Sequence, residues 1–349
     1  MSEHRTWPCS APWASFYANT PVGDVYPCCW YREPLGNLNK QDALSIWRGE
    51  AWQRLRSDMA AGDFGKCGKN CPVLAARSDD THYRLLESPV AASSGADARE
   101  ANRVLAHEEY LRGEPHQISL PVNLHYYPTS ACGIQCTMCD IWREQPKGES
   151  GILEHLQPFL DTAVTLESVG GEPMLSRKWR DFIESRGSEH PGLKLRMVTN
   201  GKFVTAKALE AFPEPDAWDW IGFSFDAVSA EALAGIRRGI SSQELKDNFD
   251  ALVSYSRDLF PITALVTVMR DNCGELEELA RYFLERYRER PHVTVSFSPI
   301  HGQWGEQTLL TSVHIAAVRR FVERYSGEPR VRGVESLRFL TDRPADGMV

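Results

Sequence analysis

The chain has 349 residues, enough for one large α/β domain and a smaller module, and its 42% hydrophobic content can supply a core. Its formal net charge of −8, without a long basic run, disfavours nucleic-acid binding. No apolar run approaches the roughly 20 residues that span a bilayer, and residues 1–8 lack a secretory pattern, so we expect a cytoplasmic protein that binds neither nucleic acid nor a membrane.

The first predicted element is a β-hairpin near the N-terminus. Trp13 to Asn19 and Asp24 to Pro27 form its two short strands, and Pro21-Val22-Gly23 forms its turn, where glycine tolerates a positive φ. A hairpin brings residues near its two ends together, so Cys9 and Cys28 can face one metal.

A helix is predicted next, from about Gln41 to Ala61, with Gly62 as its stop. Its apolar residues recur at three- and four-residue steps on one face, at Leu44, Trp47, Ala51, Leu55 and Met59. This helix would carry the chain back to the hairpin and deliver Cys67 and Cys71.

Four cysteines thus form a candidate metal site: Cys9, Cys28, Cys67 and Cys71. In a large chain without a signal, clustered thiols bind metal more often than they form disulfides. Thiolate spacing alone does not separate zinc from an iron–sulfur cluster, so both remain open at this point. Cys29 can also replace Cys28 as the ligand.

Residues 79–117 are expected to form a linker. Ser93-Ser94-Gly95-Ala96-Asp97 marks a flexible break, and Asp97 to Arg112 has the composition of a polar helix. Such a linker would allow the N-terminal module to dock on the domain that follows.

Strand and helix patterns alternate from Ile118 onward. The predicted strands are Ile118 to Tyr127, Val164 to Val169, Leu193 to Val198, Trp220 to Phe223, Ile262 to Met269 and Val293 to Ser298. The predicted helices lie near 151–160, 177–184, 205–212, 230–236, 244–259, 275–288 and 313–325. Six such repeats predict a parallel sheet with helices outside it, and functional groups at the C-terminal ends of the strands.

Three cysteines follow the first of these strands directly. Cys132, Cys136 and Cys139 form a Cys-x3-Cys-x2-Cys loop. Three thiolates can hold three irons of a [4Fe–4S] cube and leave the fourth iron open to a small molecule. The alternatives for this triplet alone are half of a zinc site or an ordinary ferredoxin cluster.

Other motifs lie at the ends of the next three strands. Gly170-Gly171-Glu172-Pro173, Thr199-Asn200-Gly201 and Ser224-Phe225-Asp226 follow them in turn. With the cysteine loop, their order and spacing resemble those of the radical S-adenosylmethionine (SAM) enzymes. The resemblance covers about 118–300 and implies a partial (β/α)6 barrel, preceded by a small hairpin-plus-helix iron–sulfur module.

The resemblance also implies a set of cofactor-binding residues. The open iron would chelate the amino and carboxylate groups of SAM. The positions carried over are Met138, Gly170, Gly171, Glu172, Pro173, Asn200, Ser224, Asp226 and Arg237. Arg237 resembles the family arginine that reaches the methionine carboxylate, and a solvated arginine at a helix end is the alternative. Met138 would pack against adenine.

The N-terminal cysteines resemble the SPASM or twitch auxiliary module of the same enzymes. Thirteen residues separate Cys9 from Gly23, and four separate Gly23 from Cys28. The resemblance implies one auxiliary [4Fe–4S] cluster, although the module here precedes the barrel instead of following it. The expected domains are the auxiliary module at 1–78, the linker at 79–117, the barrel at 118–300 and a covering extension at 301–349.

The implied activity is cleavage of SAM to a 5′-deoxyadenosyl radical that abstracts hydrogen from a substrate. An auxiliary cluster favours net oxidation, by dehydrogenation or crosslinking, of a natural-product precursor or ribosomal peptide, with flavodoxin or ferredoxin as electron donor. One alternative is a redox-neutral epimerase in which Cys273 returns a hydrogen atom, unless Cys273 is only a packed thiol. A non-catalytic iron–sulfur protein is the other alternative. In the C-terminal extension, His301 and Trp304 could contact the substrate.

Overall fold

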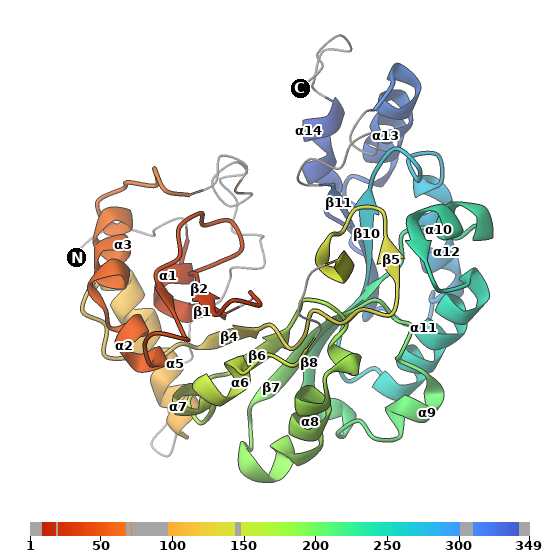
Figure 1. Ribbon diagram of the computed structural model, residues 1–349. Helices are drawn as coiled ribbons and strands as arrows, with labels where there is room; N and C mark the ends of the chain where they lie inside the picture. Colours follow the sequence, from red (N-terminus) through yellow and green to blue (C-terminus); the bar gives the residue numbers. More distant parts are fainter. Residues whose placement is uncertain are drawn as a thin grey trace. The chain divides into compact units, whose positions relative to one another are not determined.

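The computed structural model describes residues 9–18, 20–67, 71, 97–143, 148–300 and 310–341 (Figure 1). The chain divides into two compact units. The first unit comprises Met1–Thr129, Gly148–Gly170 and Arg177–Arg196, and the second comprises Ser130–Lys147, Gly171–Ser176 and Met197–Val349. His301 and Trp304 lie outside the described residues, as do residues 79–96 of the predicted linker and residues 301–309 and 342–349 of the predicted extension.

Eight strands form the main sheet, in the order β1-β4-β6-β7-β8-β10-β11-β12. Their bounds are β1 Ser15–Ala18, β4 Asn123–Tyr126, β6 Thr165–Ser168, β7 Lys194–Thr199, β8 Trp218–Ser224, β10 Ile262–Val268, β11 Val293–Pro299 and β12 Val331–Arg332. The pairings of β1 with β4, β4 with β6, β8 with β10, β10 with β11 and β11 with β12 are all parallel.

Helices follow or precede these strands along the chain. The longer ones are α3 Glu50–Ala60, α5 Ala98–Arg112, α8 Arg177–Glu189, α11 Ser242–Ser256, α12 Leu276–Arg286 and α13 Ser312–Tyr325. The shorter ones are α1 Ala11–Ala14, α2 Ala43–Trp47, α6 Ile152–His155, α7 Gln157–Leu160, α9 Ala206–Leu209, α10 Ala230–Ile236 and α14 Arg338–Thr341. In the described part of the chain, no helix combines the length and apolarity required to cross a membrane.

The predicted α/β fold class is confirmed. All six strands expected after residue 118 are present, and so is the alternation with helices. The polar helix expected at the end of the linker is α5, which begins where the Asp97 carboxylate caps the backbone N–H of Glu100 and ends at Gly113 in the left-handed region. The repeating hydrophobic pattern was sufficient to place these elements because each one buries one face.

The predicted N-terminal hairpin is wrong in its pairing. Trp13 belongs to α1, and β1 pairs in parallel with β4, with Ser15 opposite Asn123. β2 (Asp24–Val25) pairs with β3 (Gly36–Asn37) instead. The hairpin survives only as one bridge, in which Tyr17 and Tyr26 exchange two backbone hydrogen bonds of 2.9 Å. A strand has two hydrogen-bonding edges, and the sequence pattern did not indicate that β4 would occupy one of them.

The single helix predicted over 41–61 is also corrected, because it is two helices. α2 ends at Trp47, and Gly49 caps the start of α3 with an extended conformation (φ −72°, ψ 162°). Glycine is a poor residue for a helix interior, so the chain breaks there. The break lets both helices pack their tryptophans against the same sheet.

An aromatic cluster joins these helices to the sheet in the first unit. The Phe16 ring stacks on Trp52 with centroids 5.6 Å apart, and it meets Trp47 and Phe159 edge-on. The Arg56 guanidinium lies 4.5 Å from the Trp47 ring centroid and donates to the carbonyl of Pro12 at 2.9 Å. The N-terminal module is therefore built into the core of the first unit.

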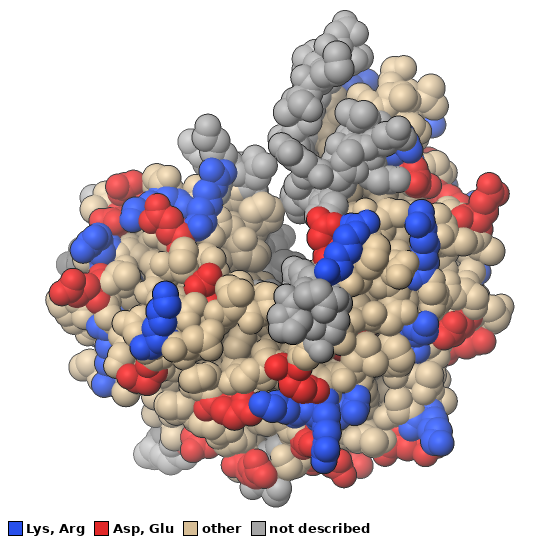
Figure 2. All heavy atoms as spheres, in the orientation of Figure 1, with Lys and Arg blue, Asp and Glu red and all other residues tan. Residues whose placement is uncertain are grey.

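Charged side chains are mixed on the molecular surface. On the face drawn in Figure 2, lysine and arginine alternate with aspartate and glutamate. That face presents no continuous basic strip among the residues that are coloured, in keeping with the formal net charge of −8.

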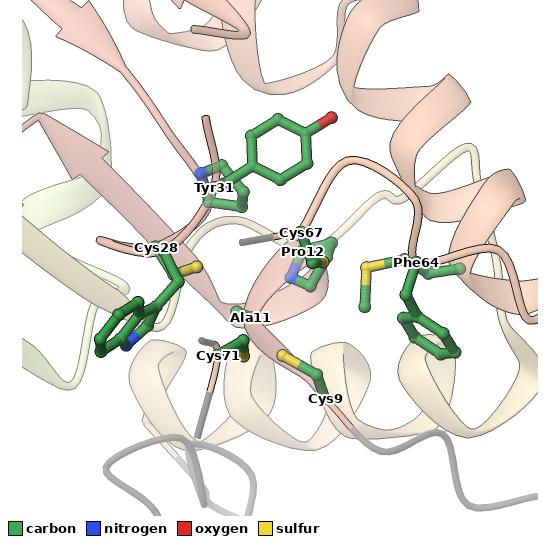
Figure 3. Close-up of a pocket in the computed structure, with 11 residues that line it drawn as sticks. Cys9, Ala11, Pro12, Cys28, Tyr31, Phe64, Cys67 and Cys71 are labelled. Carbon is green, nitrogen blue, oxygen red and sulfur yellow. The ribbon is translucent and has the colours of Figure 1, made fainter. Parts of the chain in front are cut away.

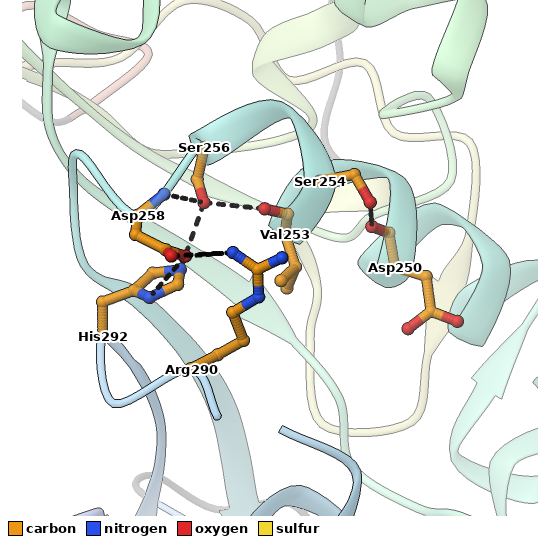
Figure 4. A network of polar contacts seen from close by, with 7 residues as sticks. All are labelled: Asp250, Val253, Ser254, Ser256, Asp258, Arg290 and His292. Atoms are coloured by element: carbon orange, nitrogen blue, oxygen red, sulfur yellow. Dashed lines mark hydrogen bonds and ion pairs between the residues drawn. The ribbon is translucent and has the colours of Figure 1, made fainter. Parts of the chain in front are cut away.

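In the second unit, a polar network fastens the end of α11 to the start of β11 (Figure 4). The Asp258 carboxylate accepts from Arg290 at 2.7 Å and lies 3.2 Å from His292 Nδ1. Ser256 Oγ lies 3.1 Å from His292 Nε2. Burial lowers the pKa of His292 although Asp258 opposes this, and the Arg290 hydrogen bond lowers the pKa of Asp258.

The network predicts a stability that declines in mild acid. Because the pKa of His292 is lower in the folded chain than its ordinary 6.5, the unfolded chain binds the extra proton first. The free energy of unfolding should therefore fall as pH drops from 7 through the lowered pKa, whereas the Asp258 contribution is lost only below its ordinary 3.8. His292→Gln should flatten this dependence in urea unfolding at pH 7.5 and 5.5. His116→Gln, at an exposed histidine, should leave it unchanged; a flattened slope there would contradict the assignment.

Candidate functional site

Four cysteines line one pocket in the first unit (Figure 3). They are the four predicted auxiliary ligands, Cys9, Cys28, Cys67 and Cys71. The remaining walls are mostly apolar or aromatic and are formed by Ala11, Pro12, Pro27, Trp30, Tyr31, Met59 and Phe64. The pocket holds about 360 Å³ of empty space, its open mouth included.

The local fold explains why these thiols meet. Cys9 lies just before α1, and Cys28 lies in the turn after β2. The chain reverses after α3, where Gly62 adopts a φ of 86°. The backbone of Cys67 then pairs with that of Tyr31 in an isolated antiparallel β-bridge. The predicted return of the chain along a helix is thus observed, in two pieces.

The neighbouring cysteines 28 and 29 differ in their surroundings. Cys28 is half-buried and lines the pocket, whereas Cys29 is exposed and is not part of the lining. The geometry therefore supports Cys28 in the ligand set.

The pocket fits a closed metal cluster. Burial, and then the neighbouring thiols of Cys71 and Cys67, raise the pKa of Cys9 to about 12, and burial raises the pKa of Cys67 to about 11. Burial also raises the pKa of Cys28. Buried thiols lose their protons when a metal replaces them, and four soft sulfur donors in apolar walls suit an iron–sulfur cluster.

The second cysteine set lies on a loop of the second unit. A short ladder fixes it, because β5 (Gln135–Cys136) pairs antiparallel with β9 (Arg237–Arg238). Cys136 is buried, and Cys132 and Cys139 are half-buried. Burial raises the pKa of Cys136 to about 11, although the Arg237 charge opposes this, and burial also raises the pKa of Cys139.

Neither set is arranged around a single ion. Within the described ranges, no three His, Cys, Asp or Glu side chains form a group that could hold one metal ion. In a cubane cluster each thiolate ligates its own iron, so the sulfurs need not converge on one point.

Lys202 fastens the cysteine loop, and the sequence patterns did not single it out. Its Nζ donates to the carbonyl of Gly133 at 3.1 Å and to that of Gly239 at 2.7 Å. It thereby ties the loop before Cys136 to the segment after β9. The only signal available was its place directly after the Thr199-Asn200-Gly201 motif.

Glu172 organises the turn after β6 from a fully buried position. Its carboxylate accepts from the backbone N–H of Met174 at 3.1 Å, the Thr199 hydroxyl at 2.9 Å and the backbone N–H of Asn200 at 2.8 Å. Its own N–H donates to Ala131 at 2.8 Å, beside the cysteine loop. Burial raises the pKa of Glu172 to about 7, against these donors. The side chain thus links two motifs, and its predicted role of charge complementarity toward SAM stays a prediction.

Glu172→Gln is expected to loosen this junction. All three groups around the carboxylate are donors, so a glutamine would turn an N–H₂ toward at least one of them. An unmatched buried donor costs about 1–3 kcal/mol. We expect a loss of about that size in the free energy of unfolding, measured by urea denaturation. Glu210→Gln, at an exposed position, is the matched control, and an equal loss in both variants would contradict this role.

The glycine and proline of this turn lie as expected for a tight strand end. Gly170 has a φ of 142°, and a Cβ there would lie 2.8 Å from the Tyr127 ring. Gly171 is half-buried, and Pro173 begins a short 3₁₀ helix, Pro173–Leu175, for which Glu172 is the cap. Their contacts with SAM remain predictions.

Three other predicted cofactor residues are directed toward the cysteines or toward one another. Asn200 Nδ2 donates to Cys132 Sγ at 3.4 Å. Arg237 donates from Nε to Asp226 at 2.5 Å and from Nη1 to Cys136 Sγ at 3.5 Å. Burial opposes the charge on Arg237, but Asp226 and the cysteines outweigh it and raise its pKa.

Two more predicted residues lie at the edges of this group. Ser224 is half-buried at the end of β8, opposite Leu265. Met138 is half-buried beside Cys139. Their proposed contacts with SAM remain predictions.

Cys273 is buried near the end of β10. Its exposed fraction is 2%, and its thiol donates to the carbonyl of Met269 at 3.0 Å. Burial raises its pKa to about 12. These surroundings support a packed thiol more than a hydrogen donor to substrate.

A row of polar side chains on the sheet of the first unit was not predicted. Tyr17, His125 and Glu167 lie side by side on β1, β4 and β6. They occupy the face opposite the one on which Phe16 and Tyr126 pack against tryptophans. His125 Nδ1 lies 3.7 Å from a Glu167 oxygen and has no hydrogen-bond partner among the described residues. The signal in the sequence that could have indicated this row is the alternation of polar with apolar residues along these strands.

Comparisons with known families agree with this geometry. Residues 126–283 match the radical SAM superfamily, and residues 9–72 match an iron–sulfur cluster-binding domain named SPASM. The chain therefore contains a radical SAM domain at residues 126–283 and, before it in the sequence, a SPASM-type module at residues 9–72. The cofactors that correspond to these two domains are a [4Fe–4S] cluster that binds SAM and an auxiliary iron–sulfur cluster.

Several solved structures are similar at low sequence identity. SuiB from Streptococcus suis bound to S-adenosylmethionine is 15% identical, with a TM-score of 0.47 over 67% of this chain and 55% of that chain. The enzyme anSMEcpe with bound AdoMet and a peptide is 16% identical, with a TM-score of 0.46 over 61% and 63%. TsrM from Kitasatospora setae, a methyltransferase, is 12% identical, with a TM-score of 0.41 over 55% and 39%.

The chain thus spans 55 to 63% of the length of the first two of these proteins. The comparison with curated proteins finds no match.

Proposed function

We propose that this chain oxidises a natural-product precursor or a ribosomal peptide by two electrons, through dehydrogenation or crosslinking. The observation that carries the proposal is that the first unit contains a four-cysteine pocket while the second unit contains a three-cysteine loop. Three ligands leave one iron available to SAM, whereas four ligands close a cluster and suit it to electron transfer. A closed cluster would provide an acceptor for the second electron that net oxidation removes from the substrate.

When bound, the cluster and SAM would supply the radical chemistry. They would generate a 5′-deoxyadenosyl radical, which takes one hydrogen atom from the substrate. The residues of the chain have other tasks. We assign Cys132, Cys136 and Cys139 to the SAM cluster, and Cys9, Cys28, Cys67 and Cys71 to the auxiliary one. Lys202 and Glu172 hold the loop and the turn that border the SAM cluster.

Net oxidation requires the substrate radical to lose one electron and one proton. A cluster held by Cys9, Cys28, Cys67 and Cys71 would supply the acceptor for that electron, and flavodoxin or ferredoxin would be the external partner. We assign His125, which lies beside Glu167 and in ring contact with Tyr17, as a proton acceptor on the sheet face opposite Phe16 and Tyr126. We also propose that the domains of the chain meet at residues 78, 117 and 300.

The test is an anaerobic reaction of the chain, loaded with both clusters, with SAM, dithionite and candidate precursors. We expect 5′-deoxyadenosine together with a product two hydrogens lighter than the precursor. A product of unchanged mass with an inverted centre would replace the proposal by epimerisation, and loss of that product in Cys273→Ala would identify the hydrogen donor. The absence of 5′-deoxyadenosine for every precursor would favour a non-catalytic protein.

A further inference from the structure

Arg237 lies between a buried carboxylate and a cysteine of the cluster loop. Its Nε donates to Asp226 Oδ2 at 2.5 Å, and its Nη1 donates to Cys136 Sγ at 3.5 Å. The side chain is 7% exposed and that of Asp226 is fully buried. Two of the three guanidinium nitrogens therefore already have partners within the protein.

The backbone holds Arg237 and Cys136 together. They are direct partners in the β5–β9 ladder, and the N–H of Thr137 donates to the Ile236 carbonyl at 3.0 Å. Lys202 also bridges the two segments, through the carbonyls of Gly133 and Gly239. The distance between the guanidinium and the sulfur is thus set by main-chain contacts.

The strands of the sheet hold Asp226 in place in turn. Its Oδ1 accepts from the backbone N–H of Thr267 in β10 at 2.6 Å, and its carbonyl accepts from Asn272 Nδ2 at 2.9 Å. Asp226 itself follows the end of β8. The position of the guanidinium is therefore held by contacts that run through Asp226 to the sheet.

We propose that Arg237 is a positioning residue that raises the reduction potential of the cluster held by Cys132, Cys136 and Cys139. Reduction adds one negative charge to a cluster. A buried positive charge and N–H donors on its sulfurs favour that more negative state, and they act strongly where water is excluded. Asn200, which donates to Cys132 Sγ at 3.4 Å, adds a second donor of the same kind.

This role differs from the one implied by family resemblance, in which Arg237 reaches the methionine carboxylate. Asp226 is also reassigned, from a SAM contact to the counter-charge that holds the guanidinium and partly offsets it. The two variants Arg237→Gln and Asp226→Asn should consequently shift the potential in opposite directions.

The test is a redox titration of the full chain with both clusters loaded, followed by electron paramagnetic resonance. The signal that changes on SAM addition belongs to the cluster with the open iron. At a fixed potential, Arg237→Gln should lower the ratio of reduced to oxidised cluster about tenfold, equivalent to about 59 mV for one electron. Asp226→Asn should raise that ratio about threefold or more. Arg238→Gln, at the exposed neighbour in β9, should leave it unchanged.

Three results would overturn the proposal. The first is an unchanged potential in Arg237→Gln. If that variant also binds SAM more weakly, Arg237 contacts the methionine carboxylate, as the family resemblance implies. The second is a shift of both variants in the same direction. The third result concerns Arg237→Lys, which is measured if Arg237→Gln does not load its cluster. This variant keeps the positive charge, so its ratio of reduced to oxidised cluster should stay within about threefold of the native ratio. A tenfold fall in that ratio would contradict the proposal.

Discussion

Replacement of Cys136 by alanine is expected to abolish the formation of 5′-deoxyadenosine while the auxiliary cluster remains. Cys136 is a buried member of the three-cysteine loop, and β9 fixes its position. With two thiolates left, the loop cannot hold a cube with one open iron. Iron content should fall from about eight to about four atoms per chain, since each cubane contains four.

Iron analysis and quantification of 5′-deoxyadenosine after anaerobic reconstitution measure this effect. Cys29→Ala is the matched control, because it also removes a thiol but at an exposed position outside both cysteine sets. Iron near eight per chain, or continued SAM cleavage, in the Cys136 variant would refute the assignment of the loop.

The second large effect is expected from a pair of adjacent cysteines. Cys28→Ala should lose the auxiliary cluster, whereas Cys29→Ala should keep it, because only Cys28 lines the four-cysteine pocket. We expect about four irons per chain in the first variant and about eight in the second. SAM should still be cleaved in Cys28→Ala, since its cluster loop is untouched, but the oxidised product should fall by at least tenfold.

This pair also tests the metal at the auxiliary site. Zinc in the native chain, removed by the Cys28 substitution, would contradict the iron–sulfur assignment. Equal iron loss in both variants would show that the two cysteines are exchangeable ligands. Undiminished oxidised product in Cys28→Ala would separate the auxiliary site from electron removal and leave the SAM cluster assignment intact.

Local spacing was enough to predict much of the fold and both cysteine sets. Cys132, Cys136 and Cys139 are close because they share one short loop, and strand and helix periods are properties of a few neighbouring residues. Cys9 and Cys67 required one further assumption, that a helix returns the chain toward its start. α3 satisfies it, so all four thiols line the pocket.

Contacts between distant segments could not be predicted from the patterns. Three contacts join residues that are far apart in sequence. They are the pairing of β1 with β4, the hydrogen bonds of Lys202 to two loop carbonyls, and the contact of Arg237 with Cys136. A motif indicates that an arginine is present but not which partner its guanidinium finds first. Burial decided that question here, because the Asp226 side chain is fully buried and pairs with the Arg237 guanidinium.

The parallel pairing of β1 with β4 bears on how the protein is made. β1 leaves the ribosome well before β4 is synthesised, yet its hydrogen bonds run to Asn123–Tyr126. The N-terminal segment must therefore wait for later residues before it can complete its fold. Deletion of that segment from an expressed fragment would uncover one edge of β4, which would then be available for pairing with other chains.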